Sequence, residues 1–521
     1  MDMDRGDMVA RLEDRQEPWD LVVIGGGATG VGVAVDAAAR GHDVLLLEAR
    51  DFGQGTSSRS TKLVHGGVRY LRQGNVPLVM EALRERGILR NNAPHLVQDL
   101  GFVVPNYDWW EAPFYGIGLK VYDALAGKYG FGASRLLSRE ETLERLPTLE
   151  PEGLRGGVIY HDGQFDDARL LIHLVRTAWE QGAVVLNHTP VEALLKDDAG
   201  YVCGVRARDG VGGGEYEIRS RGVINATGVF TDAVRRMDVP DAGRIIAPSQ
   251  GIHLVLDRRF HPGDAAIMVP HTDDGRVLFA VPWHDRVLVG TTDTPVPEPS
   301  PEPRPMEEEV EYVLRHAARY LDHDPAREDV RSAFAGLRPL VRGEEGEDTA
   351  SLSRDHTLQV SASGLVTITG GKWTTYRKMA EDAVDHATAV AGLELRPCPT
   401  RDLQIHGYLL QPERLGRLGG YGSDAAEIRA LERERPEWGE PLHPRLTLTG
   451  AEVIWALREE MALRLEDVLS RRHRALLLDA AAAVEVAEPV ARLMADEAGH
   501  DNAWIRREVD AFTTLAEGYR V

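Results

Sequence analysis

A glycine-rich turn between two short apolar runs constrains the fold of this chain more than any other feature. Residues 20–30 read DLVVIGGGATG. The apolar residues at 21–24 and 44–47 predict two buried parallel strands, and the small residues at 28–40 predict a helix between them. A strand that turns on glycines directly into a helix is typical of a Rossmann-type unit that binds a dinucleotide.

Each glycine of this turn has a separate physical role. Gly25 permits the tight turn, Gly27 lets the backbone approach a pyrophosphate, and Gly30 lets the helix pack against the sheet. The helix N-terminus then binds the phosphates, and Glu48, at the end of the next strand, binds the ribose diol. The unit by itself does not distinguish NAD from FAD.

A second small-residue turn far along the chain favours FAD. Residues 223–228 read VINATG, which predicts a buried strand ending in a turn that backbone can pass closely. NAD enzymes have no evident need for a second contact so far downstream, although a generic strand and turn would look similar. Two further segments, 53–70 and 370–377, are rich in glycine and hydroxyl side chains. We interpret them as loops over the flavin, with a surface loop and an ordinary strand-to-helix turn as the alternatives.

Composition limits the partners. The formal net charge of -22 argues against nucleic acid, whose phosphates would be repelled. The two cysteines form no CxxC motif and the histidines no ligand spacing, so no metal is expected, and the setting is expected to be reducing and cytoplasmic. No apolar stretch is long enough to span a bilayer, and residues 1–17 read as a disordered tail rather than a secretory signal.

Several motifs together resemble one enzyme family. They are SSRSTKLVHGGVRYL, NATGVFTD, PSQGIHLV, GTTDT, GLRPL, SRDH and GGKWTTYRKMAEDAVD. These segments resemble the FAD-dependent glycerol-3-phosphate dehydrogenases of the aerobic, single-subunit type, and the similarity runs from about residue 18 to the end of the chain. The resemblance implies a mixed α/β fold: a glutathione-reductase-like and DAO-like FAD-binding Rossmann domain, an antiparallel β substrate cap and a C-terminal all-helical domain.

The expected domain boundaries follow from the resemblance and from the changes of pattern along the chain. The FAD-binding domain is expected in three parts, with the cap segments and the helical domain between and after them: 18–105, 156–239 and 331–394 for FAD binding, 106–155 and 240–330 for the cap, and 395–521 for the helical domain. The predicted cofactor-binding residues are Gly25, Gly27, Ala28, Thr29, Gly30, Glu48, Thr56, Ser57, Ser58, Lys62, Leu63, His65, Gly66, Gly67, Val191, Ala226, Thr227, Gly228, Gly371, Lys372, Trp373 and Thr374.

The family resemblance also implies a reaction. Its members oxidise sn-glycerol 3-phosphate to dihydroxyacetone phosphate, with hydride passing from C2 to flavin N5 and electrons then leaving to quinone or, in an oxidase branch, to oxygen. The residues carried over as substrate-binding are Arg69, Tyr70, Arg338, Arg354 and Lys372. Guanidinium groups and a lysine suit a phosphate dianion.

The general base is expected to be a histidine, because histidine titrates nearest neutral pH. His253 in SQGIHLV is the first candidate, and His65 is the second. Arg338 is expected to polarise the hydroxyl. Rival interpretations are a related amine or 2-hydroxyacid oxidase, which would not need the helical domain, and a non-catalytic flavin-bound scaffold, which would not need these motifs.

Two segments carry open interpretations about surfaces. Residues 109–122 are rich in aromatic side chains and form either a membrane-facing element or core packing beneath the cap. The cluster RRHR at 471–474 is either a lipid contact or a solvated helix face. Peripheral contact with the inner face of the cell membrane and a homodimer both stay open at this point.

Overall fold

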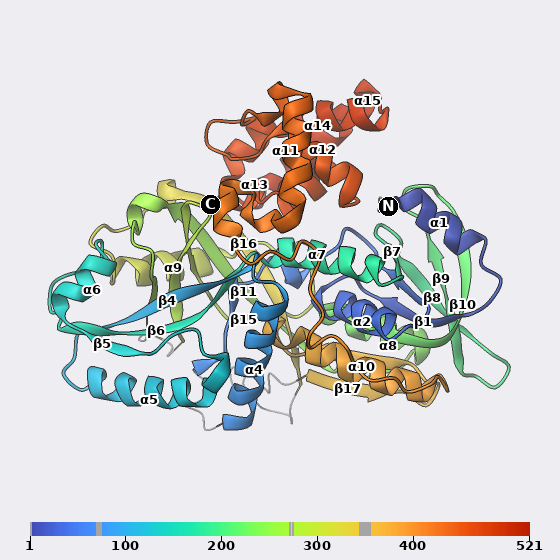
Figure 1. Ribbon diagram of the computed structural model, residues 1–521, viewed down its shortest axis with the longest axis horizontal. Helices are drawn as coiled ribbons and strands as arrows, with labels where there is room; N and C mark the ends of the chain where they lie inside the picture. Colours follow the sequence, from blue (N-terminus) through green and yellow to red (C-terminus); the bar gives the residue numbers. More distant parts are fainter. Residues whose placement is uncertain (1–2, 69–74, 270–271, 274–275, 343–355) are drawn as a thin grey trace.

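Two β-sheets lie side by side beneath a group of helices in the computed structural model of the chain (Figure 1). The structure describes residues 3–68, 75–269, 272–273, 276–342 and 356–521. Mixed α/β architecture with a separate helical C-terminal region confirms the predicted fold class.

The first sheet contains the predicted nucleotide-binding unit. Its order is β17-β18-β10-β1-β2-β7, and β8 and β9 extend β10 as a meander. These strands are β1 (Trp19–Ile24), β2 (Val44–Leu47), β7 (Val184–Leu186), β8 (Val191–Lys196), β9 (Val202–Arg208), β10 (Glu215–Asn225), β17 (His356–Val360) and β18 (Val366–Gly370). Strands β1, β2, β7, β10 and β18 pair in parallel, so their carboxyl ends meet at one edge. Ligands of open α/β sheets bind at this edge.

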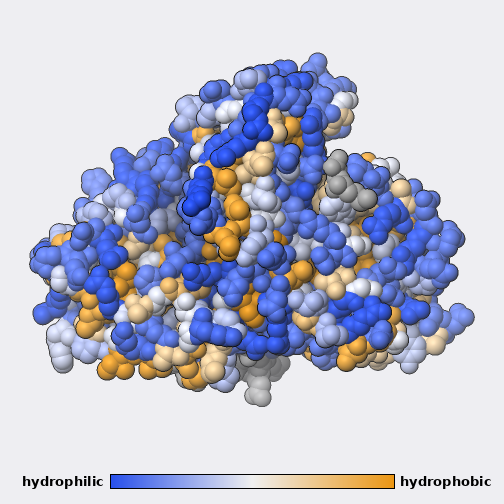
Figure 2. All heavy atoms as spheres, in the orientation of Figure 1, coloured by the Kyte–Doolittle hydropathy of each residue, from blue (hydrophilic) through white to orange (hydrophobic). Residues whose placement is uncertain are grey.

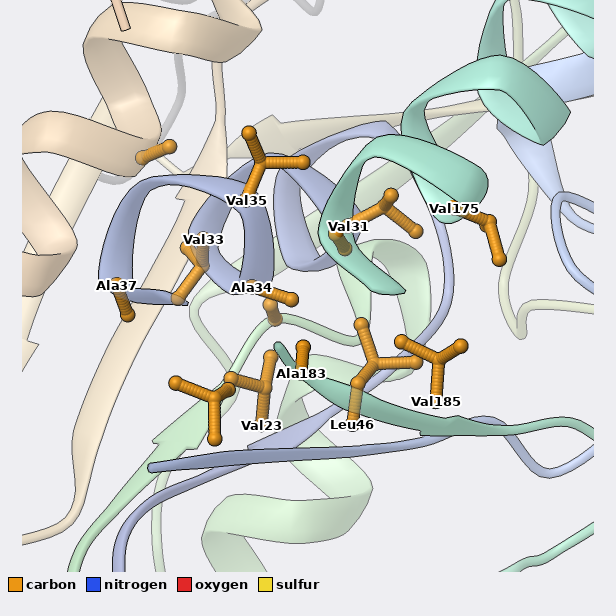
Figure 3. Packing of buried hydrophobic residues seen from close by; sticks show 14 of the residues in the cluster. Val23, Val31, Val33, Ala34, Val35, Ala37, Leu46, Val175, Ala183 and Val185 are labelled. Carbon is orange, nitrogen blue, oxygen red and sulfur yellow. The ribbon is translucent and has the colours of Figure 1, made fainter. Parts of the chain in front are cut away.

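Helices made of small and branched residues cover this sheet. They are α2 (Ala28–Ala39), α7 (Asp167–Glu180), α8 (Thr231–Asp238) and α10 (Tyr376–Val390). Figure 3 shows side chains of α2, among them Val31 and Ala34, directed at Val23 and Leu46 of the strands. The close packing of α2 against α10 requires a glycine at position 32, because a Cβ on Gly32 would lie 2.9 Å from the ring of Tyr376.

The second sheet forms the cap and is larger than the segment 240–330 in which the sequence predicted it. Its order is β15-β11-β14-β13-β12-β4-β6-β3, with β16 paired to β11 and β5 to β6. The strands are β3 (Leu63–Val64), β4 (Val97–Asn106), β5 (Arg135–Leu137), β6 (Gly156–Phe165), β11 (Ile246–Asp257), β12 (Ala266–Val269), β13 (Leu278–Trp283), β14 (Arg286–Gly290), β15 (Thr294–Pro295) and β16 (Val330–Val341). Strands far apart in sequence complete this sheet, and local patterns do not reveal such pairings.

Four more helices border the cap sheet. They are α4 (Val76–Asn92), α5 (Glu111–Ala126), α6 (Arg139–Arg145) and α9 (Glu307–Ala318). None of the helices in the described ranges is both long and apolar enough to cross a membrane.

Residues 5–13 are folded, so the prediction of a disordered tail over 1–17 was wrong for this part, while residues 1–2 lie outside the described residues. Residues 5–13 form α1 (Arg5–Glu13), which the Asp4 side chain caps. Met8 and Leu12, one helical turn apart, are both buried against the nucleotide-binding sheet. Arg5 forms an ion pair with Asp209 at 2.8 Å. Two apolar contacts and a tertiary ion pair therefore order a segment that its mixed charges had suggested was solvated.

The helical C-terminal domain sits on top of both sheets (Figure 1). It contains α11 (Ala425–Glu434), α12 (Gly450–Glu459), a π-helical turn at Asp467–Arg472, α13 (Ala475–Leu478), α14 (Ala480–Ala498) and α15 (Asn502–Glu517). The chain then returns to the cap, where the amide of Ala333 donates a hydrogen bond to the carbonyl of Tyr519 at 2.8 Å.

The arginine cluster at 471–474 in this domain is buried. It is therefore neither the lipid contact nor the solvated helix face that the sequence suggested. Arg471 and Arg472 are 2% and 4% exposed, and both donate to Asp51 of the nucleotide-binding domain at 2.5 Å. Arg474 donates to Asp167 at 3.2 Å. These guanidinium groups lie at the junction between the helical domain and the nucleotide-binding domain, where they contact carboxylates and face neither lipid nor water. The π-helical turn directs Arg471 and Arg472 into this junction.

A histidine in the linker to this domain forms a second ionic connection. His406 is 2.6 Å from Glu180 through Nδ1 and 2.8 Å from Asp424 through Nε2. Burial lowers the pKa of His406, but the hydrogen bonds to Asp424 and Glu180 outweigh burial and raise it to about 9. The imidazolium is therefore stabilised in the folded state.

We expect His406→Gln to destabilise the protein in a pH-dependent manner. The folded pKa lies above the unfolded value, so the stabilisation is complete below about pH 6.5 and is lost as the pH rises through about 9. The upper limit is about 3 kcal/mol. Thermal unfolding of wild type and variant from about pH 6 to pH 10 measures the difference. His386→Gln, at an exposed helix position, is the control. A Tm difference that does not vary with pH would contradict this role.

Candidate functional site

A cavity of about 390 Å³ opens where the parallel strands end. Glu48, Lys372 and Trp373 are among the residues that line this cavity. The Glu48 carboxylate accepts hydrogen bonds from the amides of Gly26 at 2.6 Å and Arg50 at 2.9 Å. Burial raises the pKa of Glu48, and those two amides oppose the shift. The carboxylate is thus fixed at the end of β2, where the sequence placed the ribose contact.

The glycine turn has the geometry that its predicted roles require. Gly25 has φ of +111°, and a Cβ there would lie 2.7 Å from the carbonyl oxygen of Ala226. On Gly30 a Cβ would lie 1.9 Å from the carbonyl oxygen of Gly25. The Ala28 amide, in the first turn of α2, donates to the Ser57 hydroxyl at 2.9 Å. The loop after β2 therefore meets the helix N-terminus, where phosphate binds.

Segments from widely separated parts of the chain line this cavity. The predicted cofactor-binding residues among them are Gly25, Gly27, Ala28, Thr29, Glu48, Thr56, Ser57, Val191, Ala226, Thr227, Gly228, Gly371, Lys372 and Trp373. Residues that the sequence reasoning missed also line it, namely Arg50, Gln54, Val229, Phe230, Pro301 and Pro339. A cavity lined by both a helix N-terminus and a lysine fits FAD, whose pyrophosphate and reduced ring both carry negative charge.

Four predicted cofactor residues do not line the cavities. Gly30 and Gly66 are packing positions; a Cβ on Gly66 would lie 2.4 Å from both Leu83 and Tyr122. Ser58 is buried, and its carbonyl accepts hydrogen bonds from Lys62 and Arg474. Lys62 is fully buried in an ion pair with Asp167 at 2.8 Å, which turns its amino group away from the cavities. These positions support the loop over the cofactor instead of facing it.

A second cavity of about 210 Å³ continues from the first. Both cavities share Thr56, Gly370, Gly371, Lys372 and Trp373. Its remaining lining includes Thr61, Leu63, His65, His253, Arg338 and Thr374. The structure therefore brings together candidate residues that lie more than 300 positions apart in sequence. Arg69, Tyr70 and Arg354 lie outside the described residues.

His253 projects from the middle of β11 into this region. It is 3% exposed, and its ring stacks on Phe334 with centroids 5.1 Å apart. The ring Nε2 lies 3.0 Å from the Thr61 hydroxyl. Burial lowers the pKa of His253 well below its usual value, and the charges of Lys62 and Arg338 lower it further. The imidazole is therefore neutral at physiological pH and carries the free lone pair that a base needs.

Arg338 presents a fixed guanidinium group to the same cavity. It lies on β16 opposite Ser249 of β11. Its Nη2 donates to the Thr292 carbonyl at 2.8 Å and to the Thr291 hydroxyl at 3.2 Å, and its Nη1 lies 3.3 Å from Asp293. Together with Lys372 it gives the cavity a cationic wall, which suits an anionic substrate.

A third cavity of about 170 Å³ adjoins the second cavity and shares Thr61, Leu63, His65 and Arg338 with it. Its other walls are mostly apolar and include Val68, Phe102, Tyr160, Met268 and Phe279. Gly67, predicted beside the flavin, lies here. The sequence did not predict this space as a separate cavity, because the apolar side chains Phe102, Tyr160, Met268 and Phe279 come from four different strands of the cap sheet.

One grouping of metal-type ligands occurs in the described residues, away from these cavities. Atoms of Asp51, His188 and Asp467 lie within 4.8 Å of one another. Arg471 already pairs with both carboxylates, and Arg472 pairs with Asp51. The two guanidinium groups occupy the place that a cation would take.

A cleft for a dinucleotide that continues into a cationic pocket defines the class of flavin-dependent oxidoreductases. Residues 20–377 match the family described as FAD dependent oxidoreductase, and residues 366–504 match the C-terminal domain of alpha-glycerophosphate oxidase. FAD is accordingly the cofactor.

Relatives of known name are similar over nearly the whole chain. The probable mitochondrial glycerol-3-phosphate dehydrogenase of Caenorhabditis elegans is 41% identical, over 98% of this chain and 75% of the relative. The human mitochondrial enzyme is 40% identical, over 93% of this chain and 71% of the relative. The Bacillus halodurans glycerol-3-phosphate dehydrogenase, solved with FAD, superposes with a TM-score of 0.80 at 31% identity, covering 99% and 98% of the two chains. This chain belongs to the FAD-dependent glycerol-3-phosphate dehydrogenase family.

The rival amine-oxidase interpretation accounts for the fold alone. Glycine oxidase from Geobacillus kaustophilus superposes with a TM-score of 0.54 at 20% identity and covers 75% of this chain. The two proteins share a fold over three quarters of this chain, and the remaining quarter lies outside the match.

We expect Gly30→Ala to reduce both FAD content and stability. The new methyl group would collide with the Gly25 carbonyl, so the glycine turn must shift, at a cost of about 1–3 kcal/mol or more. Flavin absorbance per protein and Tm are the measurements. Gly118→Ala, in α5 where a Cβ meets nothing within 4 Å, is the matched helical control. Full flavin content in the Gly30 variant would show that the turn tolerates a side chain.

Proposed function

We propose that this enzyme oxidises the C2 hydroxyl of sn-glycerol 3-phosphate to give dihydroxyacetone phosphate and passes the electrons to a quinone. The observation that carries the proposal is the substrate cavity, where a neutral imidazole and two cationic side chains line a space joined to the FAD cleft. The relatives named as glycerol-3-phosphate dehydrogenases support the substrate.

Bound FAD supplies a hydride acceptor at its N5 atom. The adenosine end would be held by Glu48 and the first turn of α2, and the ring end by the segment at Gly371–Thr374. Arg338 and Lys372 would bind the phosphate of the substrate, and Arg338 would also orient the C2 hydroxyl. His253 would take up the hydroxyl proton. His65, at the boundary of the two smaller cavities, is the second candidate for this task.

The motif residues Arg69, Tyr70 and Arg354 complete the proposed substrate set by their family match. Bidentate guanidinium groups match phosphate oxygens, so additional arginines would increase selectivity for a phosphorylated alcohol over glycerol.

The outer face of α5 supports a peripheral membrane association. Trp110, Phe114, Ile117 and Val121 recur at helical spacing and are 40–70% exposed, and the neighbouring Trp109 is 76% exposed. Orange spheres in Figure 2 gather along the lower left edge, where Figure 1 places α5. Tryptophan at the rim of an exposed apolar helix is typical of the interface between water and lipid. A bilayer surface is also where a quinone would be met.

Glycerol 3-phosphate should bleach the flavin absorbance of the anaerobic enzyme, because a bound substrate would reduce FAD. A soluble quinone analogue should then restore the oxidised spectrum faster than an equal concentration of oxygen. An unchanged spectrum after substrate addition would rule out the substrate. Faster recovery with oxygen, accompanied by peroxide, would identify an oxidase instead.

Ile117→Glu should reduce co-flotation with vesicles of phosphatidylethanolamine and phosphatidylglycerol, since a carboxylate on the apolar face resists insertion. Ile117 is 70% exposed, so the substitution leaves the core intact. Leu410→Glu, at a position 71% exposed in the linker, is the control. Equal flotation of both variants and wild type would contradict a role for α5.

A further inference from the structure

The two ring nitrogens of His253 have different surroundings. Nε2 lies 3.0 Å from the Thr61 hydroxyl oxygen. Nδ1 is buried and has no hydrogen-bond partner within the described part of the chain. One face of the ring stacks on Phe334, and Gly290 lies so close to the ring edge that a Cβ there would be 2.4 Å from Cδ2. A proton that reaches this imidazole must therefore arrive at Nε2, where Thr61 stands.

Thr61 lines the same cavity as His253 and lies in contact with its ring. It lines the substrate cavity and also the adjoining apolar cavity. Its hydroxyl can donate one hydrogen bond while it accepts others, which suits a group that carries protons in both directions.

The neighbours of Thr61 hold its side chain in this position. Ser60 donates from both its amide and its hydroxyl to Asp167, at 2.9 and 2.7 Å. Lys62 adopts φ of +63° and sends its amino group to the same carboxylate at 2.8 Å. Residues on both sides are thus anchored to one buried aspartate, and the side chain between them faces the cavities.

We propose that Thr61 is a catalytic residue that relays the proton of the substrate hydroxyl to His253. This inference rests on the proposed oxidation of a C2 hydroxyl. In the reactive arrangement the substrate hydroxyl donates to Thr61 Oγ1, and Thr61 donates to His253 Nε2.

The relay balances in atoms and charge. The hydrogen on C2 leaves with its electron pair as hydride to the bound flavin, and the C2–O bond becomes a carbonyl. The hydroxyl proton moves to Thr61 Oγ1 while the Thr61 proton moves to His253 Nε2, so Thr61 is unchanged and the imidazole becomes cationic. Burial and the charges of Lys62 and Arg338 disfavour that cation, so the proton returns through Thr61 to the cavity once the product has left.

Thr61→Val tests the relay, because valine keeps the shape of the side chain and removes the hydroxyl. The rate constant of flavin reduction by glycerol 3-phosphate, measured by stopped flow, should fall about 10²-fold. The dissociation constant for dihydroxyacetone phosphate, measured from the flavin spectrum, should change by less than about threefold, because binding needs no proton transfer. Thr61→Ser restores the hydroxyl and should recover most of the rate.

A double variant separates a relay from two independent effects. His253→Gln alone should lower the rate about 10²–10⁴-fold. Adding Thr61→Val should then cost less than about threefold more, since the two groups act on one proton. Thr388→Val, which removes a buried hydroxyl bonded only within α10, controls for the loss of a threonine hydroxyl as such.

Three results would overturn the relay: a Thr61→Val rate within about tenfold of wild type, losses that multiply in the double variant, or product affinity that falls as much as the rate. Failure of glycerol 3-phosphate to reduce the wild-type flavin is a different outcome, because it would overturn the proposed substrate before any variant is compared.

Discussion

The ion pairs of Asp167 connect the flavin loop and the nucleotide-binding domain to the helical domain. The carboxylate is fully buried and binds Ser60 and Lys62 of the flavin loop and Arg474 of the helical domain. Burying an unpaired carboxylate costs several kcal/mol, so the folded state needs the cationic partners of Asp167 to stabilise its charge. Burial lowers the pKa of Lys62 to about 8, with Asp167 opposing the shift. The loop between the cofactor cleft and the substrate cavity is consequently held by charges that come from two domains.

Cation and ring contacts extend this network to the substrate cavity. The Lys62 amino group lies 5.0 Å from the ring centroid of Phe334, the residue that stacks on His253. Asp51 forms a second buried ionic connection between the nucleotide-binding domain and the helical domain, through its ion pairs with Arg471 and Arg472. Breaking a buried pair of this kind typically costs about 3–5 kcal/mol. The helical domain is therefore part of the support of the active site.

Sequence patterns predicted the nucleotide-binding unit well because its physical requirements are local. Gly25 and Gly30 are dictated by a turn and a close approach within a few residues, and Glu48 follows at the end of the next strand. The class of fold and the cofactor followed from such local features and from motif resemblance.

The errors arose where long-range contacts determine the role of a residue. Lys62 lies in a hydroxyl-rich loop and looked like a cofactor contact, yet a partner 105 positions away draws it into the core. The cluster at Arg471–Arg474 looked amphipathic, yet carboxylates more than 300 positions away neutralise it. Thr61 was not singled out within its hydroxyl-rich motif, since its significance comes from its contact with His253 of β11 and from its neighbours.

The junction between the helical domain and the nucleotide-binding domain also affects the order in which the active site is completed during synthesis. Arg474 follows Asp167 by 307 positions in the sequence, so it leaves the ribosome well after Asp167 and the flavin loop. Until then Asp51 and Asp167 are carboxylates without their guanidinium partners, and the flavin loop lacks its final anchor. The final anchor of the flavin loop is therefore supplied only after residue 474 has been synthesised.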